Sequence, residues 1–153
     1  MRKWNFCAGP AVISEHVLAE VKEELLEWGD SGMSIMEMSH RSSIYDEVAT
    51  TAKKDFIDLL NIPDTHDVLF LQGGATQQFA TVPMNFGHIK KKADYVLSGT
   101  WSKKAISEAS KILEVNTIAS SEDKNFSYAP DPKSWNLSED SAYVHYCPNE
   151  TIQ

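Results

Sequence analysis

An alternation of short apolar runs with helical patterns, from Asp67 to Cys147, most constrains the fold of this 153-residue chain. The apolar runs predict four buried strands, at residues 67–71, 94–97, 115–118 and 143–147. Between the first three strands, the spacing of apolar residues predicts helices at 76–85 and from about 100 to 113. Successive strands joined through helices require crossover connections, so we expect an α/β fold with a mostly parallel sheet and flanking helices.

Two further helices are expected before this region. Ser14 can cap a helix that runs to about Trp28. Ser43, followed three positions later by an acidic residue, resembles a capping box that opens a helix through Leu60. Residues 33–43 have no clear period and predict an extended loop.

The segment between the last two predicted strands, residues 119–140, is polar and contains two prolines. It predicts a long connection, with a short strand near residues 126–128.

Charge and cysteine usage exclude several classes of function. The chain has 14 Lys and Arg against 22 Asp and Glu, a formal charge of −8, which argues against nucleic acid or an anionic membrane as partner. No apolar run approaches the length of a membrane span. Cys7 and Cys147, like the histidines, show no metal-ligand spacing, so we expect no metal, reduced cysteines and a cytoplasmic location.

Two glycines, Gly73 and Gly74, follow the first predicted strand and precede small residues at a helix start. Glycines allow a tight turn, and the first helical N–H groups lack internal partners, so this segment can cradle a phosphate to which the Thr76 hydroxyl adds a bond. A tight turn without a ligand fits the same residues. Neither a Walker loop nor a Gly-x-Gly-x-x-Gly fingerprint is present, which favours a phosphate-bearing cofactor over a nucleotide.

Polar and aromatic side chains follow the neighbouring strands. Trp101 lies just beyond the second predicted strand, and Asn149 and Thr151 lie beyond the fourth. The carboxyl ends of parallel strands meet at one edge, where ligands bind in open α/β sheets. Each residue also has an ordinary role in packing or in a turn, but a phosphate cradle beside an aromatic plate predicts a phosphorylated aromatic ring as the ligand. A separate His40-Arg41 pair, in a predicted loop, can hold a carboxylate or phosphate or can be solvated surface.

Taken together, these segments resemble the phosphoserine aminotransferase family of fold-type-I pyridoxal-phosphate enzymes. The matching segments occur in family order and cover essentially the whole chain: Asn5-Phe6-Cys7-Ala8-Gly9-Pro10, Met36-Glu37-Met38-Ser39-His40-Arg41, Gly73-Gly74-Ala75-Thr76-Gln77-Gln78-Phe79, Ala93-Asp94-Tyr95-Val96, Gly99-Thr100-Trp101 and His145-Tyr146-Cys147-Pro148-Asn149-Glu150-Thr151.

The resemblance implies pyridoxal 5'-phosphate as cofactor and amino transfer between L-glutamate and 3-phosphohydroxypyruvate, which gives O-phospho-L-serine for serine biosynthesis. It implies that Ala75 and Thr76 contact the cofactor phosphate, that Trp101 stacks on the pyridine ring, and that Thr151 hydrogen-bonds the cofactor.

For the substrate, the resemblance implies that Arg41 takes the carboxylate and that His40 lies near the phosphate. The loop that carries them serves a partner's active site in the family, so a homodimer with shared active sites is implied. Two departures affect expected contacts: Ala8 stands where some members have a substrate-contacting Ser, and Thr76 stands where some have Arg.

The family's Schiff-base lysine lies downstream of the segment that matches Thr151, so we expect no catalytic residue in this chain. The chain then corresponds to an N-terminal fragment, inactive alone, with residues 1–14 belonging to the small domain and 15–153 to the first part of the large cofactor-binding domain. The alternative is a standalone, non-catalytic α/β domain that binds a phosphorylated ligand or a partner subunit.

Overall fold

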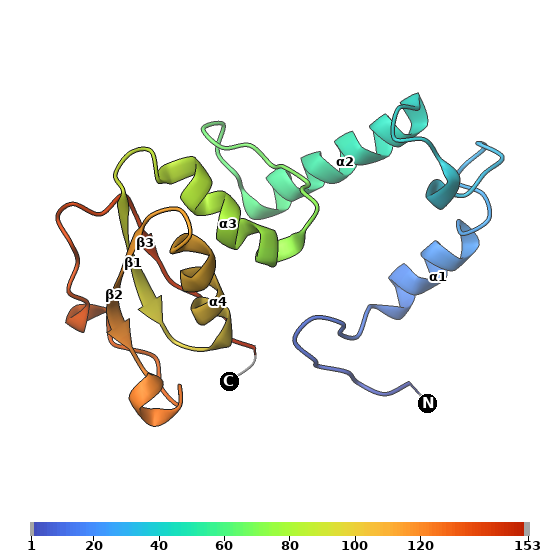
Figure 1. The fold of residues 1–153 in the computed structure, drawn as a ribbon. Coiled ribbons are helices and arrows are strands. Elements are labelled where there is room, and N and C mark those ends of the chain that lie inside the picture. Colours follow the sequence, from blue (N-terminus) through green and yellow to red (C-terminus); the bar gives the residue numbers. More distant parts are fainter. Residues whose placement is uncertain (1, 152–153) are drawn as a thin grey trace. The chain divides into compact units, whose positions relative to one another are not determined.

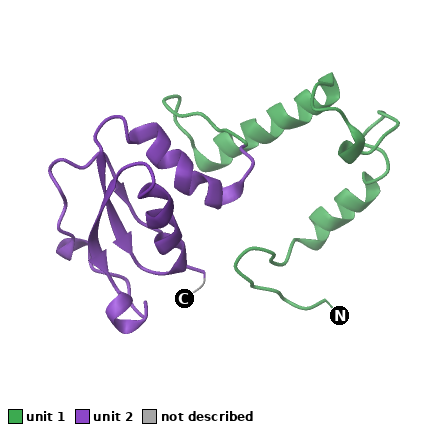
Figure 2. Ribbon diagram, viewed as in Figure 1, with its two compact units in different colours: residues 1–70 green, residues 71–153 purple. Residues whose placement is uncertain are grey.

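The computed structural model describes residues 2–151 and divides the chain into two compact units, residues 1–70 and 71–153 (Figure 2). The first unit contains helix α1 (Glu15–Glu23), the 3-10 helix η1 (Ile35–Glu37) and helix α2 (Ser43–Leu60). The second contains a sheet and its helices (Figure 1). The expected division at residue 14 into parts of a small and a large domain stays a prediction.

Helix α1 is shorter than its sequence pattern predicts. It ends at Glu23 rather than near Trp28, and the Ser14 side chain makes no capping hydrogen bond. The Trp28 N–H donates instead to the Met33 carbonyl at 2.9 Å, across a turn in which Gly29 and Gly32 have φ of 52° and 72°. That turn takes up the Trp28 amide, so the helix cannot continue to it.

Helix α2 ends at Leu60 as expected, but its cap is one residue earlier than predicted. The Ser42 hydroxyl, not that of Ser43, accepts a hydrogen bond from the Tyr45 N–H at 3.2 Å. The preceding loop is also more regular than expected, because Ser34 and Glu37 form a capping box around η1. In that box the Glu37 carboxylate accepts from the Ser34 N–H at 3.0 Å.

The N-terminal segment folds back on itself through Asn5. The Asn5 side chain donates to the Pro10 carbonyl at 2.7 Å and accepts from the Cys7 N–H at 3.0 Å. Its backbone carbonyl accepts from the Val12 N–H at 2.8 Å. One side chain therefore holds the Cys7-to-Pro10 turn closed.

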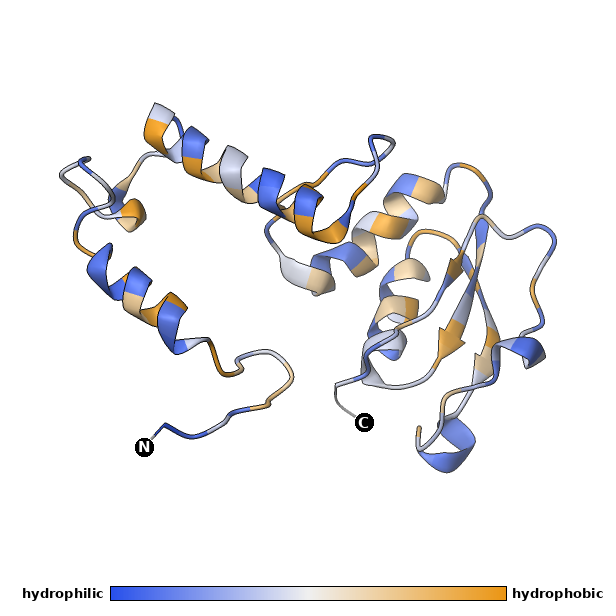
Figure 3. Ribbon diagram, turned by 180° about the vertical axis from the view of Figure 1, so that it is seen from behind, coloured by the Kyte–Doolittle hydropathy of each residue, from blue (hydrophilic) through white to orange (hydrophobic). Residues whose placement is uncertain are grey.

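Unit 1 has almost no buried core of its own. Among its described residues only Ser34 is buried, while apolar side chains such as Val21 of α1 and Leu59 of α2 are 51% and 80% exposed. Figure 3 shows apolar residues recurring along α1 and α2. These amphipathic helices therefore present apolar faces that the described residues of the unit leave exposed.

The predicted strand at residues 67–71 does not form. No strand among residues 2–151 pairs with this segment, and Leu69, Phe70 and Leu71 are 67%, 59% and 61% exposed. A strand depends on a neighbour for its backbone hydrogen bonds, so an apolar run without one stays irregular.

Unit 2 is built on a parallel sheet in the order β2-β1-β3, with its two α-helices beside it (Figure 1). Its elements, in chain order, are α3 (Gly74–Phe86), β1 (Lys92–Leu97), α4 (Thr100–Ala109), β2 (Glu114–Ser120), η2 (Glu122–Lys124), η3 (Pro132–Ser134) and β3 (Val144–His145). The predicted helices and the second and third predicted strands are therefore confirmed within a few residues, as is the parallel α/β class.

One face of the sheet packs against the helices. Ala93 and Tyr95 of β1 form a buried cluster with Ala105 and Ala109 of α4. The Tyr95 hydroxyl lies 2.8 Å from that of Tyr143, and burial raises the pKa of Tyr95. This packing fixes the height of α4 over the sheet and thereby the position of its first turn.

On the other face, the buried Asp94 carboxylate ties down the long connection that follows β2. It accepts from the Ser138 N–H at 2.7 Å, from the Ser138 hydroxyl at 2.8 Å and from the Asn116 amide at 3.0 Å. The short strand predicted near residues 126–128 is absent: Asn125 and Phe126 have φ of 50° and 59°, a left-handed conformation that no strand contains.

The final strand is shorter than predicted. Only Val144 and His145 pair with β1, and Tyr146 is 56% exposed rather than buried. No strand among residues 2–151 pairs with the outer edge of β3. Residues 143–147 therefore have a neighbouring strand on one side only, whereas a central strand has backbone hydrogen bonds on both sides.

Candidate cofactor-binding site

A cavity of about 410 Å³ lies where β3 ends and where α3 and α4 begin. The predicted cofactor residues Ala75, Thr76, Trp101 and Thr151 all line it. The other lining residues are Phe79, His145, Tyr146, Cys147, Pro148 and Asn149. Three segments that are far apart in the sequence therefore meet at the sheet edge where the pattern predicted a ligand.

The first turn of α3 offers unpaired donors to this cavity. Its N-cap, Gly73, has φ of 93° and provides no side-chain cap, so the N–H groups of Ala75 and Thr76 have no acceptor within residues 2–151. A Cβ at Gly73 would lie 2.6 Å from the Gln77 Cβ, and the positive φ disfavours any side chain. The turn therefore requires glycine and leaves a positive helix end open to an anion.

Trp101 and Thr151 form a hydrogen-bonded wall of the cavity. The Trp101 indole Nε1–H donates to the Thr151 hydroxyl oxygen at 2.6 Å. Because an indole N–H only donates, the Thr151 hydroxyl must accept in this contact, and its own hydrogen remains available to a ligand. Lys104 places its ammonium 4.4 Å from the centre of the Trp101 ring but does not line the cavity, so the indole carries a cation–π contact from outside it.

Glu150 supports a residue of the cavity wall without lining the cavity itself, and the sequence pattern did not reveal this role. Its carboxylate accepts from the Trp101 N–H at 2.8 Å and from the Ser102 N–H at 2.9 Å, at the start of α4. The available sequence signal was indirect: α4 begins after Gly99, which has no side chain with which to cap the helix. The acceptor comes from another segment, 49 residues further along the chain.

Beneath the cavity, His145 stacks on the Tyr95 ring, with centroids 4.8 Å apart, and meets Phe79 edge-on. Burial lowers the pKa of His145, although the Glu150 carboxylate opposes that effect, so we expect a neutral imidazole at neutral pH. The buried Nδ1 of His145 has no hydrogen-bond partner among the described residues. Burial also raises the pKa of the Cys147 thiol, which favours its protonated form.

The predicted substrate residues His40 and Arg41 belong to unit 1. Both are exposed, in the turn between η1 and α2, where the Arg41 N–H donates to the Ser39 hydroxyl at 3.2 Å. The two residues are consecutive in the sequence and lie in unit 1, whereas the cavity lies in unit 2. Their substrate roles stay predictions.

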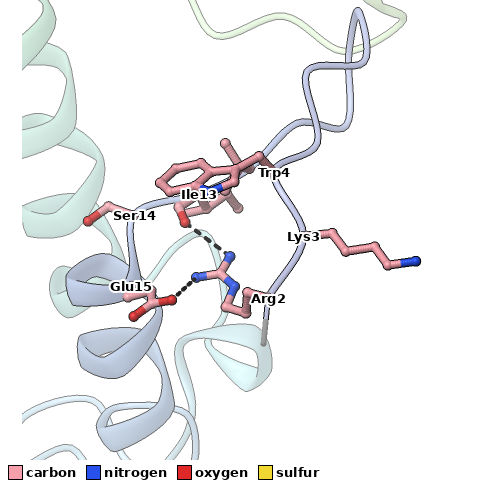
Figure 4. A pocket seen from close by; sticks show the side chains of 7 residues that line it. Arg2, Lys3, Trp4, Ile13, Ser14 and Glu15 are labelled. Carbon is pink, nitrogen blue, oxygen red and sulfur yellow. Dashed lines mark hydrogen bonds and ion pairs between the residues drawn. The ribbon is translucent and has the colours of Figure 1, made fainter.

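A second cavity, of about 420 Å³, lies in unit 1 between the N-terminal segment and the start of α1 (Figure 4). The Arg2 guanidinium donates to the Ile13 carbonyl at 3.2 Å and lies 3.5 Å from the Glu15 carboxylate. These exposed contacts already pair the Arg2 side chain. The described residues contain no cluster of ligands suited to a metal ion, and none of their helices is long and apolar enough to cross a bilayer.

The fold and the cavity define an α/β domain in which an uncapped helix start lies at the sheet edge beside a hydrogen-bonded indole. Residues 3–153 match the family described as aminotransferase class-V, and the chain therefore belongs to the class-V aminotransferases.

Among its relatives, the phosphoserine aminotransferase of Hahella chejuensis is 51% identical over 151 residues, which are 99% of this chain and 42% of that protein. The phosphoserine aminotransferase of Acidithiobacillus ferrooxidans is 52% identical over 149 residues, which are 97% of this chain and 41% of that protein.

Solved structures agree. Phosphoserine aminotransferase from Bacillus circulans subsp. alkalophilus superposes with a TM-score of 0.90 at 42% identity, over 99% of this chain and 42% of that one. The pyridoxal-phosphate-bound phosphoserine aminotransferase from Trichomonas vaginalis superposes with a TM-score of 0.87 at 38% identity, over 97% of this chain and 42% of that one. The family resemblance and the fold class are thus confirmed, and the chain spans about two fifths of the length of the relatives it matches.

Proposed function

We propose that residues 1–153 form the N-terminal part of a phosphoserine aminotransferase that uses pyridoxal 5'-phosphate. The whole enzyme would move an amino group between L-glutamate and 3-phosphohydroxypyruvate to give O-phospho-L-serine. One observation carries the proposal: the four residues expected to bind the cofactor line one cavity, in a chain that is 51% identical to a phosphoserine aminotransferase.

The free N–H groups at the start of α3 fit the cofactor phosphate. Ala75 and Thr76 supply two backbone donors that have no acceptor among the described residues, and the helix dipole adds favourable electrostatics for an anion. The Thr76 hydroxyl adds a third donor. Where an Arg at this position would bring a full positive charge, the neutral Thr76 leaves the backbone to carry most of the binding.

The Trp101 and Thr151 side chains fit the ring of the cofactor. The indole offers a flat surface for offset stacking on the pyridine ring. The free hydrogen of the Thr151 hydroxyl can be donated to the hydroxyl oxygen that the pyridine ring carries. Phe79 and His145 meet edge-on and present aromatic surface at the inner side of the cavity. When bound, pyridoxal phosphate supplies the electron sink that stabilises a carbanion on the substrate.

We assign the substrate carboxylate to Arg41, whose guanidinium can bind it through two parallel hydrogen bonds, and the substrate phosphate to the neighbourhood of His40. Both side chains are exposed in unit 1 and therefore available to a ligand or to a second subunit. We propose a homodimer in which this loop serves the partner's active site.

Both cysteines are free thiols, which fits a reducing compartment such as the cytoplasm.

The lysine that forms the covalent bond to the cofactor is assigned to the part of the enzyme beyond residue 153. No lysine lines the cavity in the described part of the chain. Lys103 pairs with Glu122 at 3.1 Å, and Lys104 covers the Trp101 ring from outside the cavity. Residues 1–153 alone would therefore lack the amine that moves the substrate proton, and we expect them to be inactive.

Borohydride trapping tests this assignment in the full-length polypeptide that contains the chain. Loading with pyridoxal phosphate should produce a visible absorbance band, and reduction followed by peptide mapping should locate the modified lysine outside residues 1–153. A modified lysine within residues 1–153, or amino transfer catalysed by these residues alone, would contradict the assignment.

Intact-mass measurement of the protein isolated from its source tests the alternative, a standalone binding domain. We expect these residues to belong to a polypeptide with a mass well above 17.1 kDa. A stable, monodisperse species of 17.1 kDa, without a second polypeptide bound to it, would favour the non-catalytic domain.

A further inference from the structure

Two helices begin at the same edge of the sheet in unit 2, and only one of them is capped. Helix α3 starts at Gly74 without a side-chain cap, whereas the first turn of α4 is occupied by the Glu150 carboxylate. A helix N-terminus attracts anions through its free N–H groups and its dipole, so the two ends would otherwise compete for a phosphate.

Glu150 is held in place from several sides. Its two carboxylate oxygens accept separately from the Trp101 and Ser102 N–H groups, and one of them lies 3.4 Å from the Ser98 hydroxyl. Gly99 permits this approach, because a Cβ there would lie only 2.7 Å from the Glu150 carboxyl carbon. The carboxylate is therefore clamped against the backbone of α4.

The same carboxylate links two residues of the cavity wall. It binds the backbone of Trp101, and its neighbour in sequence is Thr151, whose hydroxyl receives the Trp101 indole N–H at 2.6 Å. Glu150 therefore holds the backbone of Trp101, and Thr151 holds its indole ring. A shift of Glu150 would move both the stacking surface and the hydroxyl.

We propose that Glu150 is a positioning residue with two effects: it orients Trp101 and Thr151 toward the ring of the ligand, and it fills the N-terminus of α4 so that the phosphate binds at α3. This inference rests on the proposed pyridoxal phosphate site. It predicts that the Glu150 side chain acts on ligand binding through Trp101, beyond its contribution as a helix cap.

The test compares three variants of the full-length apoenzyme. Glu150→Ala removes both acceptors, Glu150→Gln keeps one acceptor oxygen at similar volume, and Glu122→Gln is the matched control, because Glu122 also contacts α4 through Lys103. Dissociation constants for pyridoxal phosphate and for pyridoxal, which lacks the phosphate, are measured by quenching of tryptophan fluorescence. Thermal unfolding of each apoenzyme is measured in parallel.

For Glu150→Ala we expect pyridoxal phosphate to bind about ten- to a hundred-fold more weakly, since hydrogen bonds to a charged group are lost. Glu150→Gln should lose roughly three- to ten-fold, because one acceptor remains, and Glu122→Gln should change binding by less than about two-fold. Pyridoxal should also lose affinity in Glu150→Ala, since its ring meets the displaced Trp101. Inorganic phosphate titrated into Glu150→Ala should occupy one more site than in the wild type, at the opened end of α4.

A second readout does not need the cofactor. In apoenzyme labelled with 5-fluorotryptophan, the Trp101 fluorine resonance, assigned with Trp101→Phe, should shift in Glu150→Ala and stay unchanged in Glu122→Gln. Unchanged binding and an unchanged resonance in both Glu150 variants would overturn the inference, as would thermal destabilisation of Glu150→Ala with wild-type dissociation constants. Failure of the wild type to bind pyridoxal phosphate would refute the proposed function instead, and the fluorine resonance would still decide whether Glu150 positions Trp101.

Discussion

The hydrogen bond between the Trp101 indole and the Thr151 hydroxyl should be measurable as a coupling free energy in cofactor binding. Thr151→Val keeps the side-chain shape but removes both the acceptor for the indole and the donor expected to meet the ligand. The indole bond is formed without a ligand, so only the expected bond to the ligand counts directly toward the binding free energy. At about 0.5–1.5 kcal/mol for one neutral hydrogen bond, the variant should bind roughly 2- to 13-fold more weakly. Thr151→Ser retains the hydroxyl and should stay within about three-fold of the wild type.

A double-mutant cycle isolates the indole bond from the ligand bond. Trp101→Phe keeps an aromatic surface and removes the indole N–H, so both single variants abolish the same 2.6 Å contact. The double variant should therefore lose less than the sum of the two, with a coupling energy of about 1 kcal/mol. The assay is reconstitution of the full-length apoenzyme with pyridoxal phosphate at fixed pH and salt. Additivity within about 0.3 kcal/mol would refute the claim that the contact positions the cavity wall.

Three further variants probe the scaffold around the site. Asp94→Ala leaves both Ser138 donors without their acceptor at a fully buried position and removes one of the two acceptors of the Asn116 amide. It should lower the free energy of unfolding by about 3 kcal/mol in denaturant titrations, and it should speed hydrogen exchange at the Ser138 amide. Asn5→Ala removes both side-chain bonds that close the N-terminal turn, and it should make that turn more sensitive to protease while changing overall stability by only about 1 kcal/mol. Gly99→Ala forces a Cβ to within 2.7 Å of the Glu150 carboxyl carbon; its cost of about 1–3 kcal/mol in stability should shrink when Glu150 is also replaced by Ala.

Features set by local sequence were the ones that the sequence predicted well. The helix ending at Leu60 is closed by Asn61 in a left-handed conformation, and the turn at Gly73 needs the φ that glycine supplies, so both follow from neighbouring residues. The cap at Glu150 depends on a residue 49 positions from its partner, which no local pattern encodes. The resemblance to the family predicted Thr151 as a site residue. The hydrogen bond from the Trp101 indole to the Thr151 hydroxyl could be identified only from the three-dimensional structure.

The failure of residues 67–71 to form a strand has a physical explanation that bears on the proposed function. The run of Val68, Leu69, Phe70 and Leu71 has the composition of a strand buried on both faces, yet three of these side chains are more than half exposed. Burying an apolar side chain of this size stabilises a protein by about 1.5–3 kcal/mol, so such a pattern is typical of a segment that packs inside a sheet. The pattern therefore supports the proposal that these residues belong to a larger sheet than residues 2–151 contain. Peptide-level hydrogen exchange should find this segment protected in the full-length polypeptide and rapidly exchanging in residues 1–153 alone; equal rates in the two proteins would argue that the apolar run has no partner strand.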